Sequence, residues 1–243
     1  MLRPLAVAVG FLTRIPVATG PVEPRDLGRA VAWFPAVGAA LGAVLVGAHH
    51  LLAGAVSPGL IAVTLVAVHA GITGGLHLDG VADVFDALGG GRGQRDRMLA
   101  IMRDSRIGAH GAAALTLVIA AKLLAVAQVL DRSAGWALYA SPVVARWAVV
   151  PIVLGFPYAR PDGLGKPFHG HAGHAQLAGA TAIAAISIGW LGARAIVPGV
   201  CGALAALAIA VWLHRRLGGL TGDVYGAAIE VAELAFLIGA GLG

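Results

Sequence analysis

Long apolar stretches alternate with short polar segments along almost the whole chain. Seven of these stretches approach or exceed the 17–25 or so residues that a helix needs to cross a bilayer. They are Val31–Gly54, Pro58–Leu76, Ala109–Leu130, Ala134–Phe156, Ala175–Ala193, Ala195–Leu213 and Val224–Leu242. The buried core of a soluble all-helical protein could imitate one or two such stretches, but not seven. The pattern therefore predicts an all-α, polytopic integral membrane bundle of about seven transmembrane helices, formed by one domain over residues 1–243.

The N-terminal segment LRPLAVAVGFLTRIPVATG is also apolar but shorter. Arg14 interrupts it, and no polar mature domain follows, as would be expected after a secretory signal peptide. We expect an interfacial or half-inserted helix here.

Composition agrees with a membrane protein. Mean hydropathy is +0.85, and only 12% of the residues are charged, against about a quarter in soluble domains. The 36 glycines suit close helix packing in lipid. The single Cys201 excludes an intramolecular disulfide.

The net charge of +5 does not indicate nucleic-acid binding, because the basic residues are spread over loops and no nucleic-acid motif is present. The positive-inside rule explains the charge better. With residues 20–30 in the cytoplasm, the opposite side holds only Arg132 and Arg194. The cytoplasmic loops hold Arg25, Arg29, Arg92, Arg95, Arg97, Arg103, Arg106, Arg160, Lys166, Arg215 and Arg216. This distribution places the aspartates at positions 79, 83 and 86 on the cytoplasmic side.

Asp79, Asp83 and Asp86 follow one another in the run TGGLHLDGVADVFDALGGG, between an apolar stretch and an Arg-rich one. In a helix, steps of four and seven residues bring all three carboxylates to nearly one azimuth, since a turn takes about 3.6 residues. Like charges on one stripe repel each other, so a chain this apolar needs a cation there. The run predicts a divalent-metal site on the cytoplasmic side, and His77 could reach a metal-bound water or a substrate hydroxyl.

A second polar cluster lies in GGLTGDVYGAAIEVAEL, where Asp223 and Glu230 are seven residues apart on one helical face. The glycines around Thr221 leave backbone amides free near a helix start, which suits a phosphate. Asp223 could instead be only a helix N-cap.

Lys122 and Arg146 lie near the middle of two predicted spans, where each charge costs about 2.5–3.5 kcal/mol on insertion scales. They either pair with carboxylates and hold helices together, or line a polar cavity and bind an anionic ligand. The group Arg103, Asp104, Arg106 and His110 directly precedes a span and suits phosphate capture at a helix N-terminus. His169, His171 and His174 have no partner acid or Cys at metal-ligand spacing, which argues against a transition-metal site.

Three long motifs carry a resemblance to a known family: TGGLHLDGVADVFDA, MLAIMRDSRIGAHG and GGLTGDVYGAAIEVAEL. They resemble the signature stretches of the cobalamin-5′-phosphate synthases, or adenosylcobinamide-GDP ribazoletransferases. The likeness extends to FLTRIPV, which contains Arg14, and to WFPAVGAALG, Lys122, Arg146 and GLGKPF, so it covers essentially the whole chain. Val84, Ala87 and Leu220 depart from residues that are frequent in the family, and none of the departures removes a carboxylate.

The resemblance implies the last step of cobalamin nucleotide-loop assembly in the cytoplasmic membrane. Adenosylcobinamide-GDP and α-ribazole, or its 5′-phosphate, would give adenosylcobalamin, or its 5′-phosphate, and GMP. The enzyme would be Mg²⁺-dependent, with the ion or ions held by Asp79, Asp83, Asp86 and Asp223. Asp86 and His77 are alternative general bases.

Further residues would bind the substrates. Charge on the transferring phosphoryl group would be offset by Arg103, Arg106, Lys122 and Arg146. Other substrate contacts would come from Arg14, Asp104, His110, Thr221 and Glu230. A homo-oligomer and contacts with other enzymes of the cobalamin pathway are compatible with this interpretation.

Two other functions remain open. The CDP-alcohol phosphotransferases also have a D-G-x-x-A motif at the end of an early helix. In this chain, however, Asp83 stands where that family has Arg, and the G-x-x-x-D-x-x-x-D motif that follows in that family is missing. An ion-coupled transporter would explain intramembrane charges, but it predicts them near the midplane rather than at helix ends.

Overall fold

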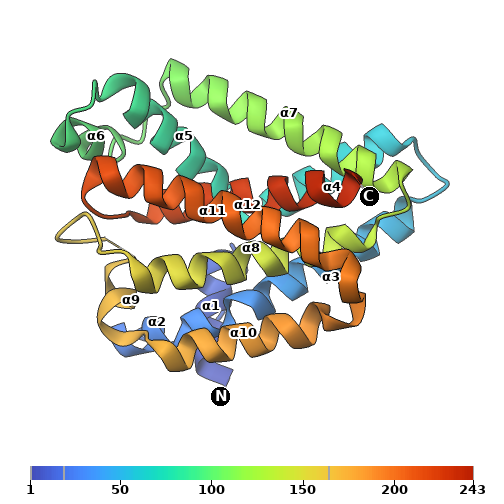
Figure 1. Cartoon of the computed structure of the whole chain (residues 1–243), viewed down its shortest axis with the longest axis horizontal. Coiled ribbons are helices and arrows are strands. Elements are labelled where there is room, and N and C mark those ends of the chain that lie inside the picture. Colours follow the sequence, from blue (N-terminus) through green and yellow to red (C-terminus); the bar gives the residue numbers. More distant parts are fainter. Residues whose placement is uncertain (1, 19, 164, 243) are drawn as a thin grey trace.

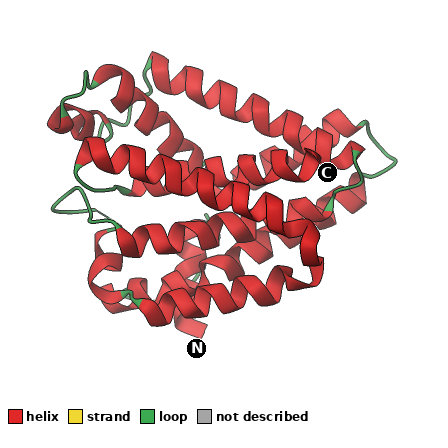
Figure 2. Cartoon of the chain, viewed as in Figure 1, coloured by secondary structure: helices red, strands yellow, loops and turns green. Residues whose placement is uncertain are grey.

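The computed structural model describes residues 2–18, 20–163 and 165–242, and this part of the chain contains helices and loops but no strand (Figure 2). The helices are α1 (Leu2–Leu12), α2 (Pro24–Ala30), η1 (Val31–Trp33), α3 (Phe34–Leu52), α4 (Pro58–Thr73), α5 (Leu76–Gly90), α6 (Arg95–Ile101), α7 (Ala109–Asp131), α8 (Trp136–Gly155), α9 (Lys166–His171), α10 (His174–Ile188), η2 (Gly189–Ala195), α11 (Ile196–Leu217) and α12 (Gly222–Leu242).

Two helices form the inside of the bundle. α12 packs against α5, α7, α8 and α11, and α8 packs against α3, α10, α11 and α12 (Figure 1). Residues within α8 and α12 are mostly buried, 78% and 72% of them in their most apolar windows, against 22% in α7. Side chains such as Leu117 and Leu124 of α7 and Ile186 of α10 point outward and contact lipid in a membrane. The predicted all-helical, polytopic membrane bundle is confirmed.

The predicted count of about seven spans compares with five or six apolar helices, because residues 174–217 are counted once although they fold as two antiparallel helices. By length and composition, five helices in the described part of the chain could cross a membrane, or six if α4 and α5 form one bent span. The predicted span Pro58–Leu76 ends early, because α4 stops at Thr73 and α5 leaves at 89°. Residues 174–217 count as one 44-residue segment. That segment turns back at Gly192 (φ 59°, ψ −142°), and Figure 1 shows α10 and α11 running in opposite directions.

The break between α4 and α5 is made by two glycines. Gly74 and Gly75 have φ of 63° and 70°, a left-handed conformation that costs other residues about 1–2 kcal/mol. The backbone N–H of Arg14, just after α1, donates to the carbonyl of Ile72 at 2.8 Å and fixes α1 beside this break. α1 itself has 11 residues, too few to span a membrane.

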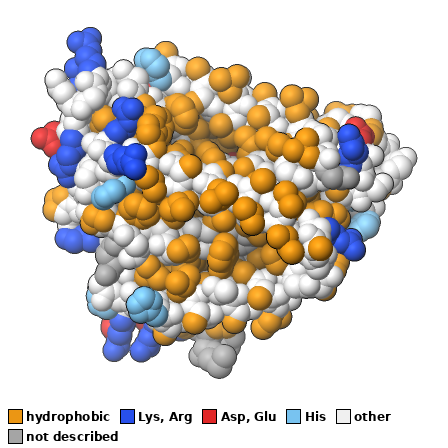
Figure 3. Space-filling view, viewed as in Figure 1, with side chains coloured by type: hydrophobic (Ala, Val, Ile, Leu, Met, Phe, Trp, Pro, Cys, Tyr) orange, Lys and Arg blue, Asp and Glu red, His pale blue; other side chains and the backbone are white. Residues whose placement is uncertain are grey.

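One end of the bundle gathers most of the Lys and Arg side chains in view, while an apolar band covers the middle (Figure 3). At this end the loop after α8 is tied to the α11–α12 turn. The N–H of Ala159 donates to the carbonyl oxygen of Leu220 at 2.8 Å. The N–H of Leu220 donates to the carbonyl oxygen of Pro157, also at 2.8 Å. Arg95 of α6 donates to the carbonyls of Leu217 and Ala159 at 2.7 and 2.9 Å. These bonds hold the loop over the start of α12.

Candidate active site

The two acidic stretches of the sequence meet where α5 crosses the start of α12. Gly80 permits the crossing, because a Cβ at this position would lie 2.5 Å from the carbonyl oxygen of Asp223. The carboxylate of Asp83 is thereby close enough to Asp223 and Asp79 for their charges to repel. Residues about 140 positions apart in sequence therefore form one acidic group.

A cavity of about 560 Å³ opens beside this group. Its polar part is lined by Asp79 and His77 of α5, Asp223 of α12, Arg14 from the segment after α1 and Arg160 from the loop after α8. The volume lies within the range of about 300–1,000 Å³ that is common for small-molecule sites. Arg14 reaches this cavity, and its side chain occupies the space where a Cβ on Gly74 would lie.

Asp223 is held by neighbours on both sides. Arg160 donates to its Oδ2 at 3.0 Å, and the hydroxyl of Thr221 donates to the same oxygen at 3.1 Å. Thr221 is fully buried, and its hydroxyl also accepts from the N–H of Val224 at 3.4 Å, as an N-cap does. Thr221, not Asp223, therefore caps α12.

Arg160 was not predicted as a site residue. It lies in a loop rich in Pro and Gly, where sequence offers no periodicity, and only the bonds between this loop and the α11–α12 turn bring it to Asp223. Tyr158 from the same loop also lines the cavity, and burial raises the pKa of its hydroxyl. The hydroxyl is therefore neutral at physiological pH.

Asp86 points away from this group. Its buried carboxylate accepts the N–H of Gly108 at 2.6 Å and the N–H of Gly111 at 2.8 Å, both at the start of α7. A Cβ on either glycine would collide with the carboxylate. Asp86 thus satisfies two of the free amides at the N-terminus of α7.

The remaining residues of the Arg-rich loop lie outside the lining of the cavity. Arg103 bonds Asp162 of the loop after α8 at 2.7 Å, and Arg106 bonds the carboxylate of Asp104 at 2.6 Å. The hydrogen bonds from Arg106 lower the pKa of Asp104 to about 2. The ring of His110 packs on Gly89. These side chains therefore contact other parts of the chain, and their role in phosphate binding stays a prediction.

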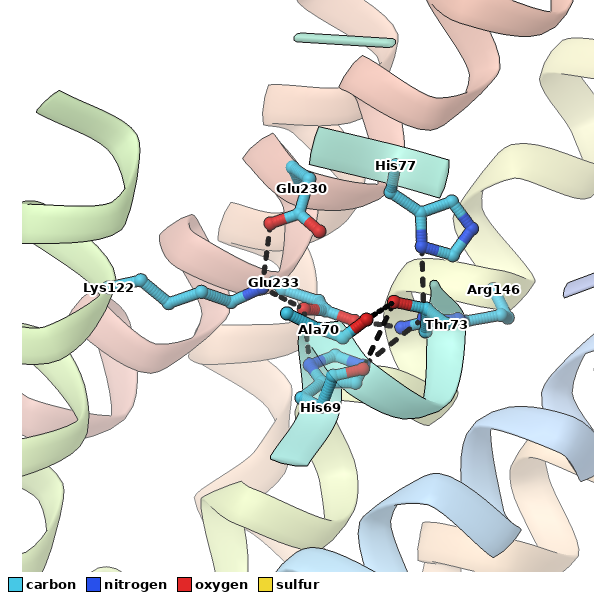
Figure 4. A network of polar contacts seen from close by, with 8 residues as sticks. All are labelled: His69, Ala70, Thr73, His77, Lys122, Arg146, Glu230 and Glu233. Carbon is cyan, nitrogen blue, oxygen red and sulfur yellow. Dashed lines mark hydrogen bonds and ion pairs between the residues drawn. The ribbon is translucent and has the colours of Figure 1, made fainter. Parts of the chain in front are cut away.

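Lys122, Arg146 and Glu230 form a separate buried ion cluster with Glu233 (Figure 4). Lys122 of α7 donates to Glu230 Oε2 at 2.7 Å and also to Glu233 of α12. Arg146 of α8 pairs with the other carboxylate oxygen of Glu233. Two positive and two negative charges balance, so the cluster joins α7 to the inner helices α8 and α12 without a net charge.

His77 links the ion cluster to the cavity. Its Nδ1 lies 3.3 Å from Arg146 Nη2, which is only a donor, so Nδ1 accepts and Nε2 carries the hydrogen. His69 meets Arg146 in the same way through its Nε2, at 3.3 Å. The Nε2 of His77 is buried and has no hydrogen-bond partner among the described residues, and Figure 4 shows it turned away from Arg146. Neutral His77 therefore offers one N–H donor beside the cavity.

The acidic group has the chemistry that Mg²⁺ prefers. This ion usually takes one or two carboxylates and completes its shell with water and substrate phosphates. Within the described residues, no group of three or more His, Cys, Asp or Glu side chains is already arranged to hold a metal. The donor set at Asp79, Asp83 and Asp223 fits an ion that arrives with a phosphate substrate. In the His tract, His171 packs on Gly28 of α2, and the side chain of His169 lies outside the described residues.

Fold and site together define a polytopic helical membrane protein whose Arg-rich end holds a cavity lined by both carboxylates and arginines. A family model described as cobalamin-5-phosphate synthase matches residues 4–241. Proteins named adenosylcobinamide-GDP ribazoletransferase are similar over their whole length. That of Geotalea daltonii is 42% identical, with 98% of this chain and 96% of the relative covered. That of Pseudomonas putida strain W619 is 40% identical, with 99% of both chains covered.

The chain therefore belongs to the cobalamin-5-phosphate synthase family, as its motifs predicted. It is a transferase of cobalamin biosynthesis. No solved structure matches it.

Proposed function

We propose that this protein is an adenosylcobinamide-GDP ribazoletransferase that joins adenosylcobinamide-GDP to α-ribazole, or its 5′-phosphate, and releases GMP. The observation that carries this proposal is the meeting of Asp79, Asp83 and Asp223 beside one cavity in a chain of this family. Both alternatives lack such support: the family differs from the CDP-alcohol phosphotransferases, and the intramembrane charges that would suit a transporter are paired with each other.

The products define the bond changes. GMP leaves with one phosphate, so a ribose oxygen of α-ribazole attacks the phosphorus on the cobinamide side, and the bond between that phosphorus and the bridging oxygen breaks. Asp83 and Asp223 would hold Mg²⁺, which supplies charge neutralisation for the diphosphate when bound. Arg160 orients Asp223, and Arg14, which lines the same cavity, would pair with phosphate oxygens.

The proton of the attacking hydroxyl goes to Asp79. Both bases considered from sequence are engaged elsewhere, His77 Nδ1 by Arg146 and Asp86 by two backbone amides. Asp79 is exposed and lines the cavity. His77 instead donates its Nε2–H to a substrate oxygen. His77→Gln, which keeps a donor, is therefore expected to retain more turnover than His77→Leu, and equal losses would contradict the donor role.

The Arg-rich end of the bundle, with the acidic cavity, faces the cytoplasm in this proposal. The distribution of Lys and Arg supports it through the positive-inside rule. In a Cys201→Ser background, a cysteine at Arg132 is expected to react with a membrane-impermeant thiol reagent in intact cells, and one at Arg92 only after lysis. The reverse labelling would overturn the orientation.

The function is tested with purified protein in liposomes. Wild-type protein is expected to form the cobalamin product and GMP with Mg²⁺, and none when EDTA is in excess. Asp83→Asn is expected to lose about 10²-fold or more in turnover, the usual scale for a disturbed metal site. Asp131→Asn, an exposed carboxylate at the end of α7, is the matched control and should behave as wild type. Absence of product from wild-type protein would refute the function, and near-normal turnover of Asp83→Asn would remove that residue from the site.

A further inference from the structure

Arg146 connects the buried ion cluster with the cavity. Its side chain is fully buried and lies outside the lining of the cavity. Its Nη2, however, lies 3.3 Å from Nδ1 of His77, which does line the cavity (Figure 4). Charge balance explains why Arg146 pairs with Glu233, but it does not explain the contact with a neutral imidazole. That contact therefore needs a different explanation.

A closed ring of contacts holds the guanidinium of Arg146 in one orientation. Its Nη1 pairs with Oε1 of Glu233, and its Nη2 lies 3.3 Å from Nε2 of His69. Because this Nε2 accepts, Nδ1 of His69 carries the hydrogen, and it lies 3.5 Å from Oε2 of Glu233. The guanidinium is planar, so fixing two of its nitrogens fixes the direction of all its N–H bonds.

This orientation determines which nitrogen of His77 carries the hydrogen. Nη2 of Arg146 has two hydrogens, one for His69 and one for Nδ1 of His77. A ring nitrogen that accepts a hydrogen bond carries no hydrogen in a neutral imidazole, so the other nitrogen carries it. Arg146 thereby holds His77 as the Nε2–H tautomer.

The Nε2–H of His77 is arranged for a ligand. The side chain of His77 is 2% exposed, and its Nε2 has no hydrogen-bond partner among the described residues. A buried donor without a partner costs about 1–3 kcal/mol. A substrate oxygen that enters the cavity removes this cost, so the tautomer that Arg146 imposes is the one that binds it.

The other half of the ion cluster does not share this arrangement. Among the described residues, the polar contacts of Lys122 go to Glu230 and Glu233. The cluster therefore consists of two charge-balanced pairs, and only the pair of Arg146 and Glu233 extends to His77.

We propose that Arg146 is a positioning residue for the transfer reaction, which holds His77 as the Nε2–H donor to a substrate oxygen. This role rests on the proposed function and replaces the direct contact with the phosphoryl group that the sequence indicated for Arg146. His77 keeps its hydrogen throughout, since the proton of the attacking hydroxyl passes to Asp79, so no further reactant is required.

Two charge-balanced double variants separate the halves of the cluster. Arg146→Met/Glu233→Gln removes the donor to His77 and leaves Lys122 paired with Glu230. Lys122→Met/Glu230→Gln removes the same number of charges and leaves Arg146 in contact with both Glu233 and His77. Because each variant retains one balanced pair, their losses of stability should be similar. Thermal unfolding in detergent checks this match.

The tautomer of His77 is read by ¹⁵N NMR of histidine-labelled protein without Mg²⁺ or substrate. Protonated and unprotonated ring nitrogens give well-separated signals, and those of His77 are identified by their loss in His77→Gln. Wild-type protein is expected to carry the hydrogen on Nε2 alone. Arg146→Met/Glu233→Gln should show a mixture of tautomers, whereas Lys122→Met/Glu230→Gln should resemble wild type.

Turnover tests whether Arg146 acts through His77. Arg146→Met/Glu233→Gln is expected to lose about 10–100-fold in kcat/KM, the usual scale for outer residues that orient a site side chain. In His77→Leu protein the donor is already absent, so the same double substitution should change kcat/KM by no more than about twofold.

Four results would overturn the role of Arg146. They are a hydrogen on Nδ1 of His77 in wild-type protein, an unchanged tautomer in Arg146→Met/Glu233→Gln, the same tautomer change in both double variants, and losses of kcat/KM that multiply in the His77→Leu background. The first needs no variant, so the proposal stays testable if a double variant does not fold. Inactivity of wild-type protein would instead refute the proposed function, while the NMR signals would still report on Arg146.

Discussion

Asp83 and Asp86 lie three residues apart on α5 but have different surroundings. Asp83 faces Asp223 of α12, whereas Asp86 binds the first amides of α7. α5 packs against both α7 and α12, so the aspartates on one face of α5 lie between these two helices. A spread of some 60° in azimuth is enough to send one side chain to each helix.

Asp86→Asn is expected to lower the stability of the protein rather than its affinity for Mg²⁺. The Asn side chain has only one acceptor oxygen, so one of the two backbone N–H groups of α7 loses its acceptor. The loss of such a buried, charge-assisted hydrogen bond costs about 1–3 kcal/mol. Thermal unfolding in detergent should show a lower Tm, and the Mg²⁺ dependence of the remaining activity should be unchanged. A raised requirement for Mg²⁺ at unchanged Tm would make Asp86 a metal ligand instead, as the sequence alone suggested.

At the scale of single elements, the break between α4 and α5 determines where the acidic stripe lies. A continuous helix through residues 58–90 would carry Asp79 and Asp83 along the direction of α4. The 89° turn at Gly74 and Gly75 instead lays α5 across the start of α12. The position of the acidic group therefore depends on Gly74 and Gly75, which have no side chain that could take part in a reaction.

Ala substitutions at the two glycines separate the cost of the turn from its effect on the site. Both residues have positive φ, so Gly74→Ala and Gly75→Ala should each destabilise the protein by about 1–2 kcal/mol. Only at Gly74 would the new methyl group collide with the side chain of Arg14, while Gly75 faces open space. Steady-state kinetics should therefore show a raised KM in Gly74→Ala and a nearly normal KM in Gly75→Ala. Equal KM values would mean that Arg14 does not contribute to binding.

At the scale of the whole molecule, the buried ion cluster connects helices that are distant in sequence. The cluster is buried and balanced in charge, with Lys122 from α7, Arg146 from α8, and Glu230 and Glu233 from α12. Breaking a buried pair usually costs about 3–5 kcal/mol, because one charge is left without a partner, whereas removing both partners costs far less. The cluster thus stabilises one arrangement of the inner helices.

A double-mutant cycle tests this role. Lys122→Met and Glu230→Gln should each be strongly destabilising, and the double variant should recover much of the loss because the Arg146–Glu233 pair stays balanced. Unfolding in detergent measures the coupling, and turnover of the folded double variant should persist. Additive losses, or a double variant that folds well but cannot bind substrate, would favour the predicted ligand-binding role of Lys122 and Glu230.

The sequence by itself determined the class of fold, the helical form of the acidic run, and the family, which the full-length matches confirm. These properties follow from the apolar length of each segment, the 3.6-residue period and the order of the motifs, all of which are local. The paired state of Lys122 and Arg146, which sequence left open, depended on contacts across 87 to 111 residues.

Only the tertiary structure decided which of the charged residues meet. Arg160 reaches Asp223 through a loop with no periodic signal, and Asp86 turns to α7 because two glycines admit it. The bend between α4 and α5 was also not foreseen, since the positive-φ residues Gly74 and Gly75 break a segment that is uniformly apolar in sequence. The hydropathy of a segment indicates whether it can lie in lipid. It does not indicate which side chains become partners, because that depends on where the helices cross. Those crossings are set by shape complementarity between segments that are distant in sequence.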